Sequence, residues 1–246
     1  MLDLHCHILP GVDDGAQTID DSIKMAKKAV KQGITHILCT PHHNRRYQNP
    51  KEEIIPAVEE LQAVFDEKGI PLTLFEGQEV RIHDQLVQEI EEDRILFADV
   101  YDQYVLIEFP TAEIPHYAET VLYDLRQMDK IPIIVHPERN LGFQEEPNQL
   151  LNFLNMGCLA QLTAPSLVGI FGKPVQKMSH QLVENGLVQM VASDAHRLKQ
   201  RDFYLKEASE YIVKHFGEKR WEQMDQMCRD IINGDPAAPF NYRGLS

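Results

Sequence analysis

Short apolar segments alternate with amphipathic helical patterns along almost the whole sequence, and this alternation constrains the fold more than any other feature. Strands that alternate with helices favour a parallel sheet covered by those helices. Seven segments have the length and composition of such strands: 2–7, 34–39, 72–76, 104–109, 133–136, 158–162 and 187–192. They predict an α/β fold, with a TIM-like (β/α)7 barrel as first choice and an open doubly wound sheet as second.

The segments between these strands contain recognisable helix ends. Thr18 is predicted to cap a helix together with Asp21, and Gly33 follows the last residues of that helix. Pro115 suits the first turn of a further helix, because proline is preorganised for that position. The segments 205–216 and 221–232 are predicted to form two terminal helices.

Length and charge limit the domain organisation and the partners. The chain has 246 residues with no internal repeat, low-complexity segment or Gly/Ser linker, so we expect a single domain over residues 1–246. Its formal net charge is −14. An acidic surface repels phosphate backbones and anionic lipid, so nucleic acid and membrane surfaces are poor candidate partners.

Three observations favour a cytoplasmic location. No apolar run approaches the 18 or so residues of a membrane helix, so we expect no membrane insertion. A cleaved signal peptide is disfavoured because the motif His5-Cys6-His7 lies where it would be removed. The four cysteines have no paired spacing typical of disulfides or of a zinc site, which predicts free thiols in a reducing compartment.

Six of the predicted strands end in residues of the types that bind metal ions. In parallel α/β folds the carboxyl ends of the strands meet on one side of the molecule, where active sites form. The candidate ligands at or near these ends are His5, His7, His42, Glu79, Glu108, His136, Asp194 and His196. Imidazole and carboxylate ligands together suit Zn, Mn, Fe or Co, and a bridging carboxylate can hold two ions. The sequence therefore predicts a metal site that can hold two ions.

The spacing within two motifs supports this interpretation. Residues two apart in a strand face the same side, so His5 and His7 should point inward while Cys6 faces the helices. Asp194 and His196 have the same spacing. His43 is ambiguous: it could support the site or be exposed. The remaining histidines have no partner motif and are expected at the surface or in the core: His36, His83, His116, His180 and His215.

Nearby polar residues extend the predicted site. Asp13 and Asp14 lie in a loop after the first strand, where they could form a turn or reach back as a ligand or base; spacing does not choose between them. Arg139 and Arg201 follow candidate ligands closely, and Arg197 is a weaker candidate. Arginines on such a rim are suited to hold a phosphate with two donors.

Three other interpretations of these residues compete with a metal-dependent enzyme that acts on a phosphate group, and each is weaker. Cys39 and Arg45 have the spacing of a cysteine-dependent phosphatase loop, but Pro41 lacks one of the backbone N–H donors that such a loop requires. An amidohydrolase would need a bridging lysine at a middle strand end, and the nearest lysine, Lys130, precedes its strand. A docking protein that binds its ligand without turnover is disfavoured because so many candidate metal ligands are present.

The motifs together resemble one superfamily of metal-dependent phosphoesterases. They are DLHCHILPGVDDG at 3–15, CTPHH at 39–43, EGQE at 76–79, LIEFP at 106–110, HPER at 136–139 and SDAH at 193–196. The ensemble resembles the PHP (polymerase and histidinol phosphatase) superfamily, and within it the bacterial CpsB/CapC/YwqE type of protein-tyrosine phosphatase. The matches span nearly the whole chain.

The resemblance implies a distorted seven-stranded barrel of the PHP type with up to three divalent metals, most commonly manganese, with iron, cobalt or zinc as alternatives. The implied ligand sets are His5, His7, Glu79 and Asp194; Glu79, Glu108 and His136; and Asp14, His42 and His196. Many superfamily members have a histidine in place of Glu108, a departure that fits the tyrosine-phosphatase branch.

The resemblance also implies a substrate and a mechanism. The expected substrate is the phosphotyrosine-containing tail of a bacterial tyrosine kinase of capsule or exopolysaccharide synthesis, attacked by a metal-bridging hydroxide. The expected catalytic residues are Arg139, Arg201, Asp14, His42 and His196. The alternative is a histidinol-phosphatase-like or other small-molecule phosphoesterase. A homo-oligomer is compatible with either function.

Overall fold

The computed structural model describes residues 1–199, 201–237 and 242–245. Within these residues, the strands form two parallel sheets, with orders β1-β2-β4 and β3-β5-β6-β7-β8-β9. The strands are β1 (Leu2–Cys6), β2 (His36–Cys39), β3 (His42–His43), β4 (Thr73–Glu76), β5 (Glu79–Arg81), β6 (Tyr104–Glu108), β7 (Ile131–Val135), β8 (Leu159–Thr163) and β9 (Met190–Ala192). The predicted parallel α/β fold is confirmed, and the sequential strand order lacks the reversal that defines a doubly wound sheet.

Backbone hydrogen bonds connect the two sheets. The N–H of Asp194 donates to His5 O at 2.8 Å and the N–H of His7 donates to Ala195 O at 2.9 Å, which joins β1 to the segment after β9. The N–H of Glu79 donates to Pro41 O at 3.1 Å where β2 and β4 continue into β3 and β5. The strand ladder therefore consists of two linked open sheets, where a single closed barrel was expected.

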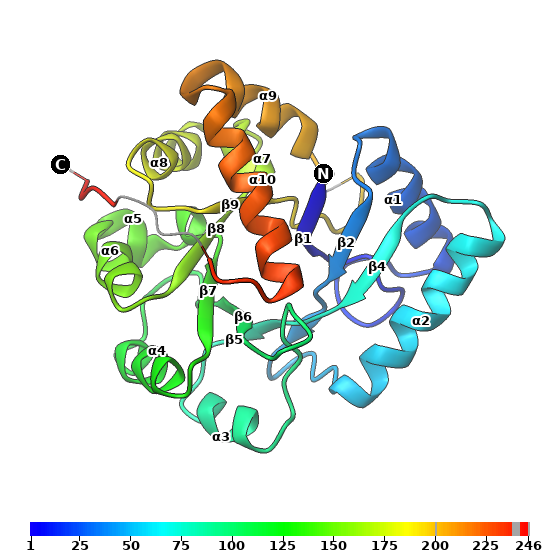
Figure 1. The fold of residues 1–246 in the computed structure, drawn as a ribbon, viewed down its shortest axis with the longest axis horizontal. Coiled ribbons are helices and arrows are strands. Elements are labelled where there is room, and N and C mark those ends of the chain that lie inside the picture. Colours follow the sequence, from blue (N-terminus) through cyan, green and yellow to red (C-terminus); the bar gives the residue numbers. More distant parts are fainter. Residues whose placement is uncertain (200, 238–241, 246) are drawn as a thin grey trace.

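Helices surround the strands (Figure 1). Their bounds are α1 (Ile19–Lys31), α2 (Lys51–Glu67), α3 (Leu86–Glu91), α4 (Ala118–Gln127), the short 3-10 helix η1 (Pro137–Arg139), α5 (Leu141–Glu145), α6 (Asn148–Asn155), α7 (Ala164–Leu167), α8 (Lys173–Glu184), α9 (Leu205–Phe216) and α10 (Glu218–Asn233). Among the described residues, no helix has the length and apolarity needed to cross a membrane.

The predicted ends of α1 are observed. The Thr18 side chain accepts a hydrogen bond from the N–H of Asp21, as in an N-cap, and Gly33 has a φ of 82° just after the C-cap residue Gln32. Helix α9 has the predicted bounds, while α10 begins three residues earlier than predicted. Helix α4 begins at Ala118, so Pro115 precedes the helix; the N–H of Ala118 donates to its carbonyl.

The apolar core consists of two clusters. The larger cluster includes most of the helix-facing residues of the strands, such as Cys6 and Ile37. The smaller cluster gathers Leu4, Leu106 and other strand residues around Met227 and Ile231 of α10. In Figure 1, α10 crosses in front of the central strands. Side chains of this helix therefore cover part of the inner faces of these strands.

An irregularity in β1 directs the polar residues of this strand. The register between β1 and β2 shifts between Asp3 and Cys6. Leu2 and Leu4 belong to the inner cluster, and simple alternation would also place Cys6 there. Because the register shifts, Cys6 lies in the helix-facing cluster, as predicted, and His5 and His7 take the opposite side.

Candidate metal centre

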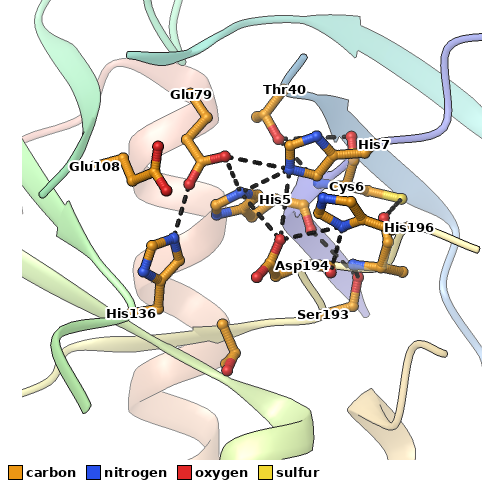
Figure 2. A network of polar contacts seen from close by, with 12 residues as sticks. His5, Cys6, His7, Thr40, Glu79, Glu108, His136, Ser193, Asp194 and His196 are labelled. Carbon is orange, nitrogen blue, oxygen red and sulfur yellow. Dashed lines mark hydrogen bonds and ion pairs between the residues drawn. The ribbon is translucent and has the colours of Figure 1, made fainter. Parts of the chain in front are cut away.

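All nine ligands predicted from the sequence come together at the carboxyl ends of the strands, and most of them appear in Figure 2. His5 belongs to β1 and His7 follows it; His42, Glu79 and Glu108 belong to β3, β5 and β6. The others occupy loops after strands: Asp14, His136, Asp194 and His196. Three overlapping groups have ligand atoms that all lie within 4.8 Å of one another, a spacing compatible with shared metal ions.

The first group contains His5, His7 and Glu79, all buried. The two Nε2 atoms of His5 and His7 lie 3.2 Å apart. Oε2 of Glu79 lies 3.4 Å and 3.3 Å from these nitrogens, and Oδ1 of Asp194 lies 3.5 Å and 3.4 Å from them. This arrangement contains the four residues of the first implied ligand set.

The second group contains His42, Glu79 and Glu108. Nδ1 of His42 lies 2.8 Å from Oε2 of Glu79 and 3.9 Å from Oε2 of Glu108. The other oxygen of Glu79, Oε1, lies 2.7 Å from Nε2 of His136. Glu79 thus contacts histidines from three strand ends and stands between two groups, the position that a bridging carboxylate needs.

The third group contains His7, Asp14, His42 and His196. Oδ1 of Asp14 lies 3.3 Å from Nε2 of His42 and 3.4 Å from Nε2 of His196. Asp14 is exposed, whereas the neighbouring Asp13 is buried behind His7. Of the two aspartates that the sequence left open, Asp14 is therefore the one among the candidate ligands.

Two buried partners orient the imidazoles of β1. Nδ1 of His5 lies 2.8 Å from Oε1 of Gln161, and Nδ1 of His7 lies 2.7 Å from Oδ2 of Asp13. Both partners accept hydrogen bonds, so each Nδ1 carries a proton and each Nε2 lone pair faces the centre when the ring is neutral. Metal-binding histidines characteristically have such partners. No sequence motif indicates Gln161, because it lies within an otherwise largely apolar strand.

The donor set fits divalent metal ions. In the described part of the chain, Oε2 of Glu79 and Nδ1 of His42 are buried without a hydrogen-bond partner of suitable geometry, although they lie close together. Two facing Nε2 atoms also repel each other when both rings are neutral. Cations bound between these atoms would satisfy both, and nitrogen with oxygen ligands suits borderline divalent ions.

Several of the candidate ligands have strongly perturbed pKa values. Although burial opposes it, nearby histidines hold the pKa of Glu79 well below its usual range, and Arg139 with Arg201 does the same for Asp194. Burial and the charge of Glu79 raise the pKa of Glu108 to about 7. Perturbed values of this kind concentrate at functional sites.

Burial raises the pKa of carboxyl groups but lowers the pKa of two of the histidines. It is the main cause that lowers the pKa of His136 to about 4, helped by Arg139, and of His196 to about 4, helped by His7. Both rings are therefore neutral at pH 7, the form that binds metals. Asp14 and Glu79 raise the pKa of His42 to about 10 against the effect of burial.

Two candidate ligands have left-handed backbone conformations. His136 has a φ of 40° directly after β7, and Asp194 has a φ of 50° shortly after β9. Histidine and aspartate tolerate this region better than bulkier residues, yet it is uncommon outside glycine. Such conformations often occur at functional sites, where the surrounding structure maintains them. Here they turn the chain sharply at two strand ends.

Arginines balance part of the negative charge. Arg139 and Arg201 both form ion pairs with Asp194, the second at 3.1 Å from Nη1 to Oδ2. Arg81 donates from Nε and Nη2 to Oε2 of Glu108 at 2.9 Å and 2.8 Å, a contact that sequence analysis did not predict. Arg197 donates to Gly15 O at 3.3 Å and stabilises the loop that carries Asp14.

A cavity of about 260 Å³ opens onto the centre. Arg139 and Arg201 line it together with Asp194, His136 and Glu108. Guanidinium groups beside candidate metal ligands are well placed to hold an anion such as a phosphoryl group.

Two other motif residues lie outside this arrangement. Cys39 is fully buried in the helix-facing cluster, and burial raises the pKa of its thiol, so it cannot serve as the nucleophile of a phosphate loop. Nε2 of His43 lies 3.2 Å from Oε2 of Glu89, beside His83, rather than among the candidate ligands.

The fold and this centre define a class: a parallel α/β protein with a buried histidine–carboxylate cluster of the kind that metallohydrolases use. Comparison with known proteins gives the family. Residues 1–230 match the family model described as "Capsular polysaccharide synthesis, CpsB/CapC". The chain belongs to the CpsB/CapC family.

Relatives with assigned names agree with this assignment. The chain is 44% identical to the tyrosine-protein phosphatase YwqE of Bacillus subtilis (strain 168) over 218 residues, which cover 88% of this chain and 85% of YwqE. It is 40% identical to the putative tyrosine-protein phosphatase CapC of Staphylococcus aureus, over 84% and 81% of the two chains. Identity to the tyrosine-protein phosphatase CpsB of Streptococcus pneumoniae is 26%, over 91% and 94%.

Solved structures agree. A crystal structure from work on YwqE and CpsB, described there as unique metal-dependent tyrosine phosphatases, superposes with a TM-score of 0.96 at 39% identity over the full length of both chains. An amidohydrolase from Mycoplasma synoviae superposes with a TM-score of 0.52 at 11% identity, over 96% and 89%. The second likeness shows a shared fold only.

Proposed function

We propose that this protein is a metal-dependent protein-tyrosine phosphatase. The observation that carries the proposal is the gathering of nine candidate ligands, with Arg139 and Arg201 on the same cavity. Seven of the nine form three overlapping groups, and His136 and Asp194 contact members of these groups. The relatives named above, tyrosine phosphatases by name and described as metal-dependent, point to the same reaction.

The three proposed ligand sets overlap the observed groups without matching them. The second set has His136, which contacts Glu79, where the observed group has His42. His5, His7, Glu79 and Asp194 would hold one ion; Glu79, Glu108 and His136 a second; and Asp14, His42 and His196 a third. Manganese is the proposed metal, and the donor set also accepts iron, cobalt or zinc. When bound, such ions activate a water molecule and neutralise phosphoryl charge.

The protein's own residues would bind and orient the ester. Arg139 and Arg201 would hold the phosphoryl oxygens with paired N–H donors, an interaction that strengthens as charge develops. Asp14, the most exposed of the ligands, lines the cavity together with His42, and substrate and water would enter at this side. The buried His196 lies behind Asp14, with its Nε2 3.4 Å from Oδ1 of Asp14. The tyrosine leaving group has a pKa near ~10, so it departs with less protonation than an alkoxide.

The proposed substrate is a phosphotyrosine-containing segment of a bacterial tyrosine kinase of capsule or exopolysaccharide synthesis, encountered in the cytoplasm. The family description, capsular polysaccharide synthesis, supports this choice. A small ester such as histidinol phosphate is the alternative. A homo-oligomer would be compatible with both.

We further propose that residues 1–246 act as one PHP-type domain whose strands form a distorted seven-stranded barrel. The continuation of β2 and β4 into β3 and β5, and the bonds between β1 and the segment after β9, support this view.

Chelation tests the reaction. Exhaustive treatment with EDTA should abolish hydrolysis of a phosphotyrosine peptide, and Mn²⁺ should restore it, because the nucleophile requires the ions. Cys39→Ser is the control and should retain kcat, whereas His136→Ala should lose several orders of magnitude. Activity that survives chelation, or that is lost only in Cys39→Ser, would refute the metal mechanism.

A further inference from the structure

A second, larger cavity adjoins the metal centre and forms a groove of about 990 Å³. It shares Asp14, His42 and Glu108 with the smaller cavity of about 260 Å³, so the two are continuous. Sites that enclose a whole small ligand usually measure about 300–1,000 Å³. Because the proposed function places the phosphoryl group and metal ions in the smaller cavity, the adjoining groove offers space for the rest of an ester.

One wall of this groove is a loop with a fixed conformation, residues 44–49. Oδ1 of Asn44 accepts from the N–H groups of Arg46 and Tyr47 at 2.9 Å and 3.0 Å. Nδ2 of Asn49 donates to His42 O at 2.8 Å, and Gln78 donates to Asn49 O at 2.7 Å. Both ends of the loop are anchored, so its side chains are preorganised for binding.

Tyr47 connects this loop to the metal centre. Its ring is nearly parallel to that of His42, with 6.0 Å between centroids and an interplanar angle of 12°. The Arg46 guanidinium lies 4.9 Å from the Tyr47 ring centre. Pro110 and Tyr117 also line the groove. A further aromatic ring packs favourably against such surfaces, edge-on or offset.

The charges of the groove differ in availability. Arg81 is held by Glu108, and Arg94 by Glu89 and Glu92. Arg45 is exposed, and its side chain has no charged or hydrogen-bonding partner in the part of the chain that the structure describes.

The acidic residues of the groove limit where a negative group can bind. Glu52 and Asp84 line the groove as well. An acidic group on a bound chain would therefore be attracted to Arg45 and repelled by Glu52 and Asp84.

From these observations we propose that the groove binds the tyrosine ring and neighbouring residues of a phosphotyrosine polypeptide. Tyr47 contacts the ring, and Arg45 pairs with an acidic residue beside the phosphotyrosine. This inference rests on the proposed phosphatase function and adds a preference for aryl esters in an acidic peptide.

Kinetics with three substrates test the role of Tyr47: an acidic phosphotyrosine peptide, a neutral one, and para-nitrophenyl phosphate, which has no flanking residues. Tyr47→Ala should raise KM for all three substrates about tenfold or more, because each carries an aryl ring, and Tyr47→Phe should restore KM because the ring at position 47 is retained. Tyr123→Ala, at a tyrosine 54% exposed on α4, is the control. Metal content should be unchanged.

Charge reversal tests Arg45. Arg45→Glu should raise KM for the acidic peptide about fivefold and leave KM for the neutral peptide and para-nitrophenyl phosphate within twofold, because an exposed ion pair contributes modestly. Arg243→Glu reverses an exposed arginine outside the groove lining and should change none of them.

Calorimetric binding of a non-hydrolysable phosphonate version of the acidic peptide provides a readout independent of turnover. The Kd should increase in Tyr47→Ala and Arg45→Glu by the same factors as KM. Wild-type Kd and KM in both variants would overturn the groove proposal while leaving the phosphatase intact. If the metal-loaded wild type hydrolyses none of the three esters, the proposed phosphatase function is refuted. Binding of the phosphonate peptide would then still test whether the groove binds the peptide.

Discussion

Buried partners of the ligands determine how well individual residues can act at this centre. Gln161, on β8 of the six-stranded sheet, accepts a hydrogen bond from Nδ1 of His5 on β1, and this contact fixes the direction of Nε2. Such a partner typically contributes 10–100-fold to metal affinity. The contact depends on side-chain direction within β8, so no sequence pattern indicates it.

Gln161→Leu should therefore weaken metal binding by about 10–100-fold, as measured by competition with a chelating dye. Gln189→Leu is a matched control, because Gln189 is also buried and accepts from the N–H of Ala160 outside the ligand cluster. The control should lose stability without losing metal affinity. Equal metal affinity in Gln161→Leu and wild type would contradict the assigned role.

Arg139 provides a second residue-scale prediction. Arg139→Ala should lower kcat/KM by about 10²-fold, because it removes paired donors to the phosphoryl group. Arg139→Lys should recover little, since an ammonium cannot reproduce the fork. Metal content should remain that of wild type, which separates substrate binding from disruption of Asp194. Arg229→Ala, on the exposed face of α10, should be neutral, and near-normal kinetics in Arg139→Ala would exclude a catalytic role.

At the scale of the elements, the loop after β1 packs tightly against His7. A Cβ on Gly15 would lie 2.1 Å from His7 O and 2.5 Å from His7 Cβ. The adjacent Ala16 N–H donates to that same carbonyl at 3.0 Å. Only glycine allows this packing, which positions both Asp13 and Asp14.

Gly15→Ala should consequently reduce the free energy of unfolding by about 2 kcal/mol or more and weaken metal binding. Gly69→Ala is the comparison, because Gly69 has a φ of 62° and open space around it, so only backbone strain applies. Thermal unfolding and metal titration of both variants provide the measurement. Equal stability and equal metal affinity in Gly15→Ala and Gly69→Ala would show that the close packing of Gly15 against His7 does not matter.

Strong periodic patterns made most elements predictable. All seven expected strands exist, with ends that differ by up to three residues, and α1 has the predicted cap. Strands β3 and β5 were not predicted, because they contain two and three residues and follow breaks at Pro41 and Gly77. The arginine contact to Glu108 was missed for a related reason, since Arg81 belongs to one of these short strands.

At the scale of the molecule, assembly of the centre is linked to pH. In the metal-free protein, His7 has a pKa raised well above its usual value: burial would lower it, but Asp13 more than compensates. His42, with a pKa of about 10, is also protonated at pH 7, and Glu108, at about 7, is half protonated. Ligands must lose these protons to bind metal, so affinity should rise with pH.

Metal loading at pH 7 should therefore release about two to three protons per chain. Calorimetric titration with Mn²⁺ in two buffers of different ionisation enthalpy measures this number. A His42→Gln variant should release about one proton fewer. Proton uptake, or a heat independent of the buffer, would show that the ligands are already deprotonated.

The contact between the first strand and the end of the last strand also affects how the chain folds. Asp3 accepts hydrogen bonds from Ser193, 190 residues later, and the bonds from Asp194 to His5 and from His7 to Ala195 lie beside it. Contacts between such distant positions form late and slow the folding of a domain. Because His5, His7 and Asp194 flank this junction, the metal centre exists only after the chain ends have met. Bound ions should therefore slow unfolding while leaving the folding rate nearly unchanged.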